Sequence, residues 1–307
     1  MNILVTGGAG FIGSHLCEQL IKNNHEVIVI DDLSSGCISN LSKVFKKITF
    51  YENKLEEFNF DCLSEIDSVV HLSSQTSVPV SIKKYSKSSS SNMLSSINII
   101  DFCANKNIPL VYASSAAVYG NLNVGDDLSN EKDLLSPYAV DKYSMELYAK
   151  MANKLYGLSS IGLRFFNVYG PRQDPKNSYS GVISIFCDSI LNDKSITVYG
   201  GKQTRDFIYV GDVAASIIKS IDKVIDSDIS ETINILTGRS TSIDSIADTL
   251  IQLTEKPTKK IYKDLPAGDP KGSPGTSSKM LDILGVDQTN LVKIEDGLSA
   301  TIDYFRY

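Results

Sequence analysis

The sequence contains few of the side chains that bind metal ions or form disulfides. Its 307 residues include three histidines and five cysteines. The cysteines lie far apart and form no Cys-X-X-Cys pair, a spacing that is typical of zinc sites and redox motifs. Their odd number also argues against a disulfide framework. We therefore expect reduced thiols, no bound metal ion and a cytoplasmic location.

Long apolar runs and an excess of positive charge are also missing. No apolar stretch reaches the ~18 residues that a membrane-spanning helix needs. A strand is expected from the second residue onward, which leaves no place for a basic leader. The formal net charge is −6, whereas binding to nucleic acid favours a basic face. The sequence therefore predicts a small-molecule partner, with neither a membrane span nor a nucleic-acid site.

The first half of the chain alternates short apolar segments with amphipathic ones. We expect strands at residues 2–6, 25–31, 66–72, 108–114 and 159–165, and helices at 11–23, about 90–105 and 137–156. The strand segments are apolar almost throughout, as in strands that are covered on both faces. This alternation predicts an α/β fold with a Rossmann-type, doubly wound parallel sheet.

The pattern changes after about residue 166, where glycine, proline, asparagine and aspartate become frequent. Residues 205–210 and the helical segment 211–225 are expected to add one more β-α unit to the first sheet. The chain then divides into a dinucleotide-binding domain (1–165 plus about 205–230) and a smaller α/β substrate-binding lobe (about 166–204 plus 231–307).

The stretch "NILVTGGAGFIGSHLCEQL" joins a strand, a glycine turn and a helix, with Gly7, Gly10 and Gly13 spaced as G-X-X-G-X-X-G. In a dinucleotide site such glycines permit a tight turn, the approach of the backbone to a pyrophosphate, and close packing of helix and sheet. Asp31 ends the second strand, where a carboxylate can accept hydrogen bonds from both hydroxyls of an adenosine ribose. Because that carboxylate would repel a 2′-phosphate, the sequence favours NAD over NADP.

A serine, a tyrosine and a lysine form a candidate set for proton transfer. Tyr138 and Lys142 are four residues apart in a segment that is helical after Pro137, so they share one helix face. A phenol has a pKa of about 10, and an ammonium within ~4–6 Å together with a positive nicotinamide ring would lower it. Ser115 follows the neighbouring strand and can hydrogen-bond the same substrate hydroxyl. This set suits removal of a proton from an alcohol, coupled to hydride transfer onto NAD.

Six segments then point to a family: "TGGAGFIGSHL", "SSAAVYG", "PYAVDKY", "LRFFNVYGPRQDP", "VYGGKQTRDFIYVGDVA" and "GDPKGS…SKMLDILG". They cover nearly the whole chain, and together they resemble the extended short-chain dehydrogenase/reductases and, among these, the UDP-sugar 4-epimerases. The resemblance implies that Tyr138 is the base, that Lys142 is its partner and a cofactor anchor, and that Ser115 orients the substrate hydroxyl. It also implies NAD as a tightly held cofactor and a UDP-sugar as substrate.

The resemblance assigns two further groups of residues. Beside Gly7, Gly10, Gly13 and Asp31, the residues implied to line the cofactor are Phe11, Ile12, Asp32, Ser35, Gly36, Leu55, Leu72, Ser73, Asn92 and Phe165. The residues implied to contact the substrate are Asn167 at the uridine diphosphate, Arg205 at the diphosphate, Val182, Thr197, Val198 and Tyr199 around the uracil, and Ser273 at the sugar. As alternatives, Phe165, Phe166 and Tyr199 can be plain core aromatics, and Arg205 can pair with Asp206.

Two alanines bear on the reaction. In the related 4,6-dehydratases and decarboxylase, acids follow the active-site hydroxyl, and here Ala116 and Ala117 stand at those places. Methyl groups cannot transfer protons, so elimination lacks its catalyst. The resemblance then implies oxidation at C4, rotation of the 4-keto sugar and re-reduction. Since Ser273 stands where glucose-specific relatives carry a bulky aromatic, we expect UDP-GlcNAc and UDP-GalNAc as substrates, with UDP-Glc and UDP-Gal as further ones.

Several alternatives remain open. The arginine with which the family contacts the diphosphate is replaced by Pro266, so Arg205 acts alone or Lys202 or Lys271 substitutes. The competing hypotheses are a 4,6-dehydratase, a 4-ketoreductase, an epimerase for a larger UDP-amino sugar and a non-catalytic nucleotide sensor. The resemblance also implies a homodimer formed by the helices near 92–105 and 137–155. The apolar residues Met145, Leu147, Tyr148 and Met151 can supply its surface, and a packed core explains them equally well.

Overall fold

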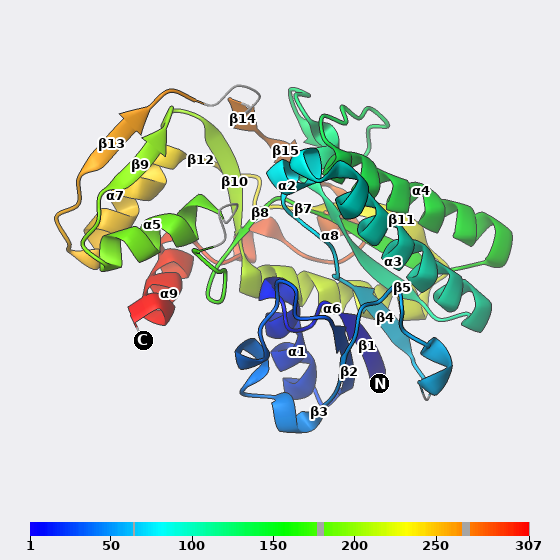
Figure 1. Ribbon diagram of the computed structural model, residues 1–307. Coiled ribbons are helices and arrows are strands. Elements are labelled where there is room, and N and C mark those ends of the chain that lie inside the picture. Colours follow the sequence, from blue (N-terminus) through cyan, green and yellow to red (C-terminus); the bar gives the residue numbers. More distant parts are fainter. Residues whose placement is uncertain (64, 177–180, 266–270, 307) are drawn as a thin grey trace.

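The computed structural model describes residues 1–63, 65–176, 181–265 and 271–306. Its larger part is built on a seven-stranded sheet in the order β11-β7-β5-β4-β1-β2-β3, in which every neighbouring pair is parallel (Figure 1). These strands are β1 (Asn2–Thr6), β2 (Glu26–Asp31), β3 (Ile48–Glu52), β4 (Ser68–His71), β5 (Leu110–Ser115), β7 (Ser160–Phe165) and β11 (Ser230–Ile235). The predicted doubly wound α/β fold is confirmed.

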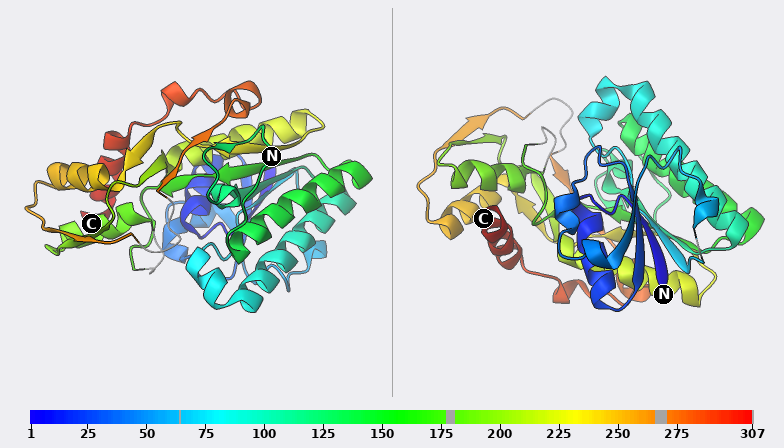
Figure 2. Two further views of the ribbon diagram at one scale, coloured as in Figure 1. Left: turned by 90° about the horizontal axis from the view of Figure 1, so that it is seen from above. Right: turned by 60° about the horizontal axis from the view of Figure 1, so that its bottom comes forward.

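Helices cover both faces of this sheet, as the two views of Figure 2 show. One face packs against α1 (Phe11–Lys22) and α6 (Val210–Asp226), and the other against α3 (Tyr85–Lys106) and α4 (Pro137–Tyr156). Consecutive strand residues therefore point into different cores: Val5 packs with α1 and α6, whereas Leu4 packs with α3 and α4. Burial on both sides explains why these strand segments are apolar almost throughout.

The smaller lobe is built around β10 (Thr204–Tyr209), which pairs with β8 (Asn167–Tyr169), β12 (Ser240–Ser242) and β14 (Gly272–Ser273). Its core is formed with α5 (Val182–Leu191), α7 (Ile243–Thr254), α9 (Ile294–Arg306) and β9 (Ile196–Tyr199). The remaining elements are α2 (Val78–Lys83), α8 (Lys279–Asp282) and two pairs, β13 (Lys260–Lys263) with β9, and β15 (Gly275–Thr276) with β6 (Gly125–Asp126).

The expectation that residues 205–210 add a strand to the first sheet is wrong. Strand β10 belongs to the sheet of the smaller lobe, although the helix that follows it, α6, returns to cover the large sheet through Val213 and Ile217. The last strand of the large sheet is instead β11, most of which falls in the range expected for the smaller lobe. An apolar pattern reports that a strand is buried and says nothing about its partner strands.

Within the part of the chain that the structure describes, none of the helices combines the length and the apolar character needed to cross a bilayer.

Candidate active site

The glycine turn follows β1 at the carboxyl edge of the large sheet, where ligands bind in doubly wound folds. Gly7 has a φ of 72°, which residues with a Cβ rarely adopt. A Cβ on Gly13 would lie 2.2 Å from the carbonyl oxygen of Gly7, so only glycine lets α1 start this close to the turn. Gly10 caps α1 without a side-chain hydrogen bond, which leaves the positive helix end open to an anion. This cradle fits a dinucleotide pyrophosphate.

Asp31 lies beside the turn, at the end of β2. Its Oδ2 accepts a hydrogen bond from the Ala9 N–H at 2.9 Å, and its Oδ1 accepts one from the Leu33 N–H at 2.9 Å. Burial raises the pKa of this carboxyl group, and the two backbone bonds oppose that shift. The two bonds fix the orientation of the carboxylate next to the glycine turn, as a ribose-binding acid requires.

The other residues that the resemblance assigned to the cofactor differ in their position and burial. Leu72 and Ser73 line the turn, because a Cβ on Gly7 would lie 2.8 Å from the Ser73 nitrogen. Leu55 is buried in the core under α3, and Phe165 in the core under α6. Phe11 and Ile12 open α1, while Asp32, Ser35 and Gly36 lie in the loop after β2. Their contacts with the cofactor remain a prediction.

Asn92 has a structural task that the sequence does not reveal. Its amide nitrogen donates to Asp141 Oδ2 on α4 at 3.0 Å and to the Gln75 carbonyl at 3.2 Å, and its Oδ1 accepts from the Gln75 N–H at 2.8 Å. The buried side chain thus ties α3 to α4 and to the loop that follows β4.

The structure brings Ser115, Tyr138 and Lys142 together. Ser115 ends β5, and its hydroxyl is hydrogen-bonded to Tyr138. Lys142 Nζ donates to the Ala113 carbonyl at 2.9 Å and lies 5.8 Å from the centre of the Tyr138 ring. The predicted start of the helix at Pro137 is confirmed, with the Ser136 hydroxyl accepting from the Ala139 N–H. An alcohol bound here can therefore reach a hydroxyl and a phenol at the same time.

The expected lowering of the Tyr138 pKa by Lys142 together with a nicotinamide ring stays a prediction, and in the chain by itself burial sets the direction of the shift. Burial raises the pKa of Tyr138, and the hydrogen bond with Ser115 opposes this only in part. Burial also lowers the pKa of Lys142 to about 8, against a smaller raising effect of Asp141. The Lys142 ammonium is directed to the Ala113 carbonyl. At Lys142, burial therefore outweighs the charge of Asp141, whereas at Tyr138 burial and Asp141 both raise the pKa.

Three of the residues assigned to the substrate lie on neighbouring strands of the smaller lobe. Arg205 on β10 is the register partner of Ser273 on β14. Further along β10, Asn167 starts β8, and its amide donates to the Asp206 carbonyl at 3.0 Å. Lys271 precedes β14, and its carbonyl accepts from the Thr204 N–H at 3.1 Å. The structure thus places Arg205 beside Ser273 on the neighbouring strand, whereas Pro266 lies outside the described residues.

The residues assigned to the uracil differ in exposure. Val182 begins α5, while Thr197, Val198 and Tyr199 belong to β9. The Val198 side chain is completely buried in the core of the lobe, so only its main chain can meet a ligand. Tyr199 is exposed, with Lys263 Nζ 6.0 Å from the centre of its ring. The sequence did not indicate Lys263, because β13 approaches β9 only in the folded chain.

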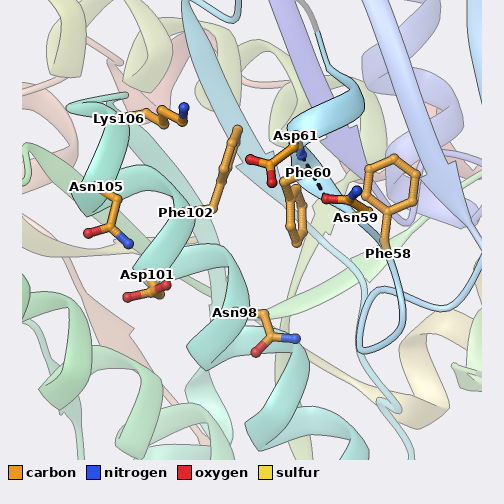
Figure 3. A pocket seen from close by; sticks show the side chains of 9 residues that line it. All are labelled: Phe58, Asn59, Phe60, Asp61, Asn98, Asp101, Phe102, Asn105 and Lys106. Atoms are coloured by element: carbon orange, nitrogen blue, oxygen red, sulfur yellow. Dashed lines mark hydrogen bonds between the residues drawn. The ribbon is translucent and has the colours of Figure 1, made fainter.

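The pocket in Figure 3 contains none of these residues. It lies between the segment 58–61 and the second half of α3, and it is lined by Phe58, Asn59, Phe60, Asp61, Asn98, Asp101, Phe102, Asn105 and Lys106. The rings of Phe60 and Phe102 stack with their centres 4.7 Å apart and pack against the core under α3. We therefore assign this hollow to packing of the core and place the active site at the strand ends.

His71, at the end of β4, is a buried histidine whose neutral state should make the stability of the protein depend on pH. It is completely buried, with Nδ1 2.7 Å from Thr6 Oγ1, and burial lowers its pKa to about 3 from 6.5. Below pH 6.5, His71 is therefore protonated in the unfolded chain but stays neutral in the native protein. We expect the free energy of unfolding to fall by up to about 1.4 kcal/mol per pH unit on acidification from that point.

Urea unfolding at a series of pH values measures this slope. The matched variant His71→Gln lacks the titrating group and should show a shallower decline by about 1 kcal/mol per unit. Equal slopes in the two proteins would contradict the assignment of His71 as a neutral buried histidine.

The fold and the site together define a class: dinucleotide-dependent enzymes that act on an alcohol with a Ser–Tyr–Lys set at the carboxyl edge of a doubly wound sheet. Comparison with known proteins narrows this class. The model of the NAD dependent epimerase/dehydratase family matches residues 3–235. The chain belongs to this family, and its cofactor is NAD.

Three solved structures resemble the whole chain. The UDP-glucose 4-epimerase of Thermotoga maritima, solved with UDP-glucose, is 33% identical, has a TM-score of 0.92 and is matched over 100% of this chain and 99% of its own. The UDP-N-acetylglucosamine 4-epimerase of Methanobrevibacter ruminantium, in complex with UDP-N-acetylmuramic acid, is 37% identical, with a TM-score of 0.92 and coverage of 99% and 97%. The UDP-glucose 4-epimerase of Thermus thermophilus, in complex with NAD, is 31% identical, with a TM-score of 0.88 and coverage of 100% and 99%.

Proposed function

We propose that the protein is a UDP-N-acetylglucosamine 4-epimerase that interconverts UDP-GlcNAc and UDP-GalNAc and also accepts UDP-Glc and UDP-Gal. The observation that carries the choice of sugar is the register of β10 and β14, which sets Ser273 opposite Arg205. A guanidinium is suited to a diphosphate, so the sugar attached to that diphosphate would lie near Ser273. A small side chain at this place leaves room for a 2-acetamido group.

In the proposed reaction, NAD supplies the two-electron acceptor and donor for C4. Ser115 holds the 4-hydroxyl of the sugar, and Tyr138 accepts its proton and later returns the proton to the same oxygen. Lys142 is anchored by the Ala113 carbonyl below the Tyr138 ring and places its charge beside the reacting groups. The protein ends each cycle in the protonation state in which it began, as an isomerase requires.

Inversion at C4 also requires the sugar to turn while the nucleotide stays bound. The residues proposed for uridine and diphosphate include Tyr199 and Arg205, which belong to two separate sheets of the smaller lobe, β9 with β13 and β10 with its partners. We expect binding energy to be concentrated on the UDP portion, because strong contacts to one face of the sugar would oppose its rotation.

The competing reactions of the fold need additional proton-transfer groups. Ala116 and Ala117 form the 3₁₀ turn directly after Ser115, and the Ala117 N–H donates to the Ser115 hydroxyl at 3.1 Å. Their methyl groups cannot protonate a leaving hydroxyl, which disfavours a 4,6-dehydratase. A 4-ketoreductase or a dehydrogenase would change the NADH concentration, so absorbance during turnover distinguishes them from an epimerase. A larger UDP-amino sugar is the second candidate substrate, favoured by the similarity to the M. ruminantium enzyme.

Enlarging Ser273 tests the sugar assignment. We expect Ser273→Tyr to lower the turnover of UDP-GlcNAc by about 10²-fold or more, because a phenol ring would occupy the space of the acetamido group. The variant should still epimerise UDP-Glc. Both sugars are assayed by proton NMR, and Ser273→Ala serves as the matched control that keeps the pocket open. Unchanged turnover of UDP-GlcNAc in Ser273→Tyr would overturn the assignment.

We also propose that the protein is a homodimer. The outer faces of α3 and α4 expose Leu94, Ile97, Leu147, Met151 and Leu155, and Tyr148 lies beside them. Of the two alternatives for Met145, surface or packed core, the structure shows the second, because Met145 is buried in the core under α3 and α4. An exposed apolar stripe over two adjacent helices is typical of an interface.

A charge on this stripe tests the proposal. Leu147→Glu is expected to shift sedimentation from dimer to monomer, because a carboxylate would be desolvated at the interface. Leu128→Glu, at an exposed leucine in a loop, is the control and should remain dimeric. A monomeric wild-type protein at micromolar concentration would exclude the dimer.

A further inference from the structure

Three buried polar residues form a row across the large sheet. Ser114 on β5 is the register partner of Arg164 on β7, and Arg164 is the register partner of Asn234 on β11. All three are less than 5% exposed, at 2%, 4% and 0%. Polar groups cost free energy when buried without partners, so a row of this kind inside an otherwise apolar parallel sheet needs a complete set of hydrogen bonds.

Two residues from outside the sheet satisfy the row. Glu146 of α4 receives hydrogen bonds from Arg164 Nε at 2.8 Å and from Arg164 Nη2 at 2.6 Å, and its Oε1 also accepts from the Ser114 hydroxyl. Tyr119 joins the other side, since its hydroxyl accepts from Arg164 Nη1 at 2.7 Å and donates to Asn234 Oδ1 at 2.7 Å. The five side chains form one connected network.

One end of the network lies at the catalytic set. Glu146 is one helical turn beyond Lys142 and two turns beyond Tyr138, on the same face of α4. Ser114 directly precedes Ser115. The bidentate ion pair and the Ser114 bond therefore fix the position of α4 above the ends of β5 and β7, and it is this position that determines where Tyr138 meets Ser115.

The other end of the network lies at the strand pair beside the proposed sugar site. The Asn234 amide donates to the Thr276 carbonyl at 2.8 Å and to the Gly125 carbonyl at 3.0 Å. These carbonyls belong to β15 and β6, and β15 follows β14, which carries Ser273. Asn234 thus connects the large sheet to the segment that would face the sugar.

We propose that this network positions both halves of the active site: Glu146 holds Tyr138 in line with Ser115, and Asn234 holds the segment that carries Ser273. The inference rests on the proposed function, in which these residues act on the sugar. A buried ion pair can often be replaced by apolar side chains without loss of stability, so stability alone gives no reason for this one. What apolar side chains cannot reproduce is the fixed orientation of a bidentate pair.

The double variant Glu146→Leu/Arg164→Met separates positioning from stability. Both charges are removed together, so neither is left buried alone, and the thermal midpoint is expected to stay close to that of the wild type. We expect kcat to fall by about 10-fold to 100-fold and KM for the UDP-sugar to change by less than about threefold, because a small misplacement of a catalytic group lowers the rate more than binding. A folded double variant with wild-type kcat would overturn the proposal.

Single variants decide the matter if the double variant does not fold. Ser114→Ala keeps the ion pair and removes only the bond from β5 to α4, so kcat should fall several-fold with an unchanged KM. Tyr119→Phe removes the bridge between Arg164 and Asn234, so KM should rise with a smaller effect on kcat. Wild-type values of kcat in the first variant and of KM in the second would each refute the corresponding half of the proposal.

Two further variants complete the design. Glu231→Gln breaks the 2.6 Å ion pair with Lys279, at the opposite end of β11, and should leave kcat unchanged. A kcat loss in this control equal to that of the double variant would show a general effect of lost ion pairs and contradict the proposal. Tyr138→Phe distinguishes failure of the proposed function from failure of the network proposal. Full activity in Tyr138→Phe refutes the proposed function. An inactive Tyr138→Phe together with a fully active double variant refutes only the positioning role of the network.

Discussion

Replacing Tyr138 by phenylalanine is expected to lower kcat by about 10²-fold to 10⁴-fold, the range that positioned acid–base groups contribute. The substitution removes one oxygen from a buried ring and leaves the packing of α4 intact. The main-chain N–H of residue 138 still donates to Ser81 Oγ, and Lys142 is still held by the Ala113 carbonyl. The loss therefore reports the phenol itself, since nothing else in the site needs to move.

The measurement is the initial rate of epimerisation at saturating UDP-sugar, accompanied by the thermal midpoint and by binding of UDP, which should both stay near wild-type values. Tyr304→Phe is the matched control, because Tyr304 is an exposed tyrosine on α9, outside the proposed site and the proposed interface. A Tyr138→Phe protein with more than about a tenth of the wild-type rate would remove Tyr138 from the role of proton acceptor.

Replacing Gly13 by alanine is expected to eliminate bound NAD. A Cβ at this position would lie 2.2 Å from the Gly7 carbonyl oxygen and 2.8 Å from the Gly8 Cα, both of which belong to the backbone of the turn. A backbone cannot rotate away as a side chain can, so α1 must move off the turn that holds the pyrophosphate. We expect a loss of stability of about 1–3 kcal/mol and little cofactor in the purified protein.

Cofactor content is measured by releasing the nucleotide and determining it chromatographically. Gly285→Ala is the control, since Gly285 also requires a positive φ, of 63°, but has open space around a new Cβ and lies in no part of the proposed site. It should lose about 1 kcal/mol of stability and keep its NAD. Normal NAD content in Gly13→Ala would show that the glycine turn is not the pyrophosphate cradle.

Much of the large sheet could be predicted because its strands are buried on both faces. Strands β1, β2, β4, β5 and β7 are apolar runs, and Leu4 and Val5 show why, since they pack into different cores. Strand β11 was not predicted, because its first half is only partly buried and because it contains the polar residue Asn234. That residue is tolerated inside the sheet only by virtue of hydrogen bonds to Tyr119, Gly125 and Thr276, which no local pattern reveals.

In the candidate site, too, features set by local geometry could be predicted and features set by distant segments could not. The glycine turn and the Tyr138–Lys142 pair are recognisable because their geometry is local, a turn and one helical repeat. The pKa of Tyr138 also depends on burial by distant segments, which the local spacing of Tyr138 and Lys142 does not reveal. The network of Glu146, Arg164 and Asn234 depends on strand register. Its sequence signals were an acid on the Tyr138 face of the helix and an arginine within the apolar run "SIGLRF".

The central claim is that the chain inverts a UDP-sugar at C4 without net redox change, and one experiment tests it most directly. UDP-GlcNAc and, in a separate sample, UDP-Glc are incubated with the purified protein in deuterium oxide and followed by proton NMR and by absorbance of NADH. The account predicts that UDP-GalNAc forms until the two sugars reach a constant ratio, that the hydrogen at C4 is retained, and that no NADH accumulates. Failure to interconvert both UDP-GlcNAc and UDP-Glc, deuterium at C4, or a dehydrated product would contradict it.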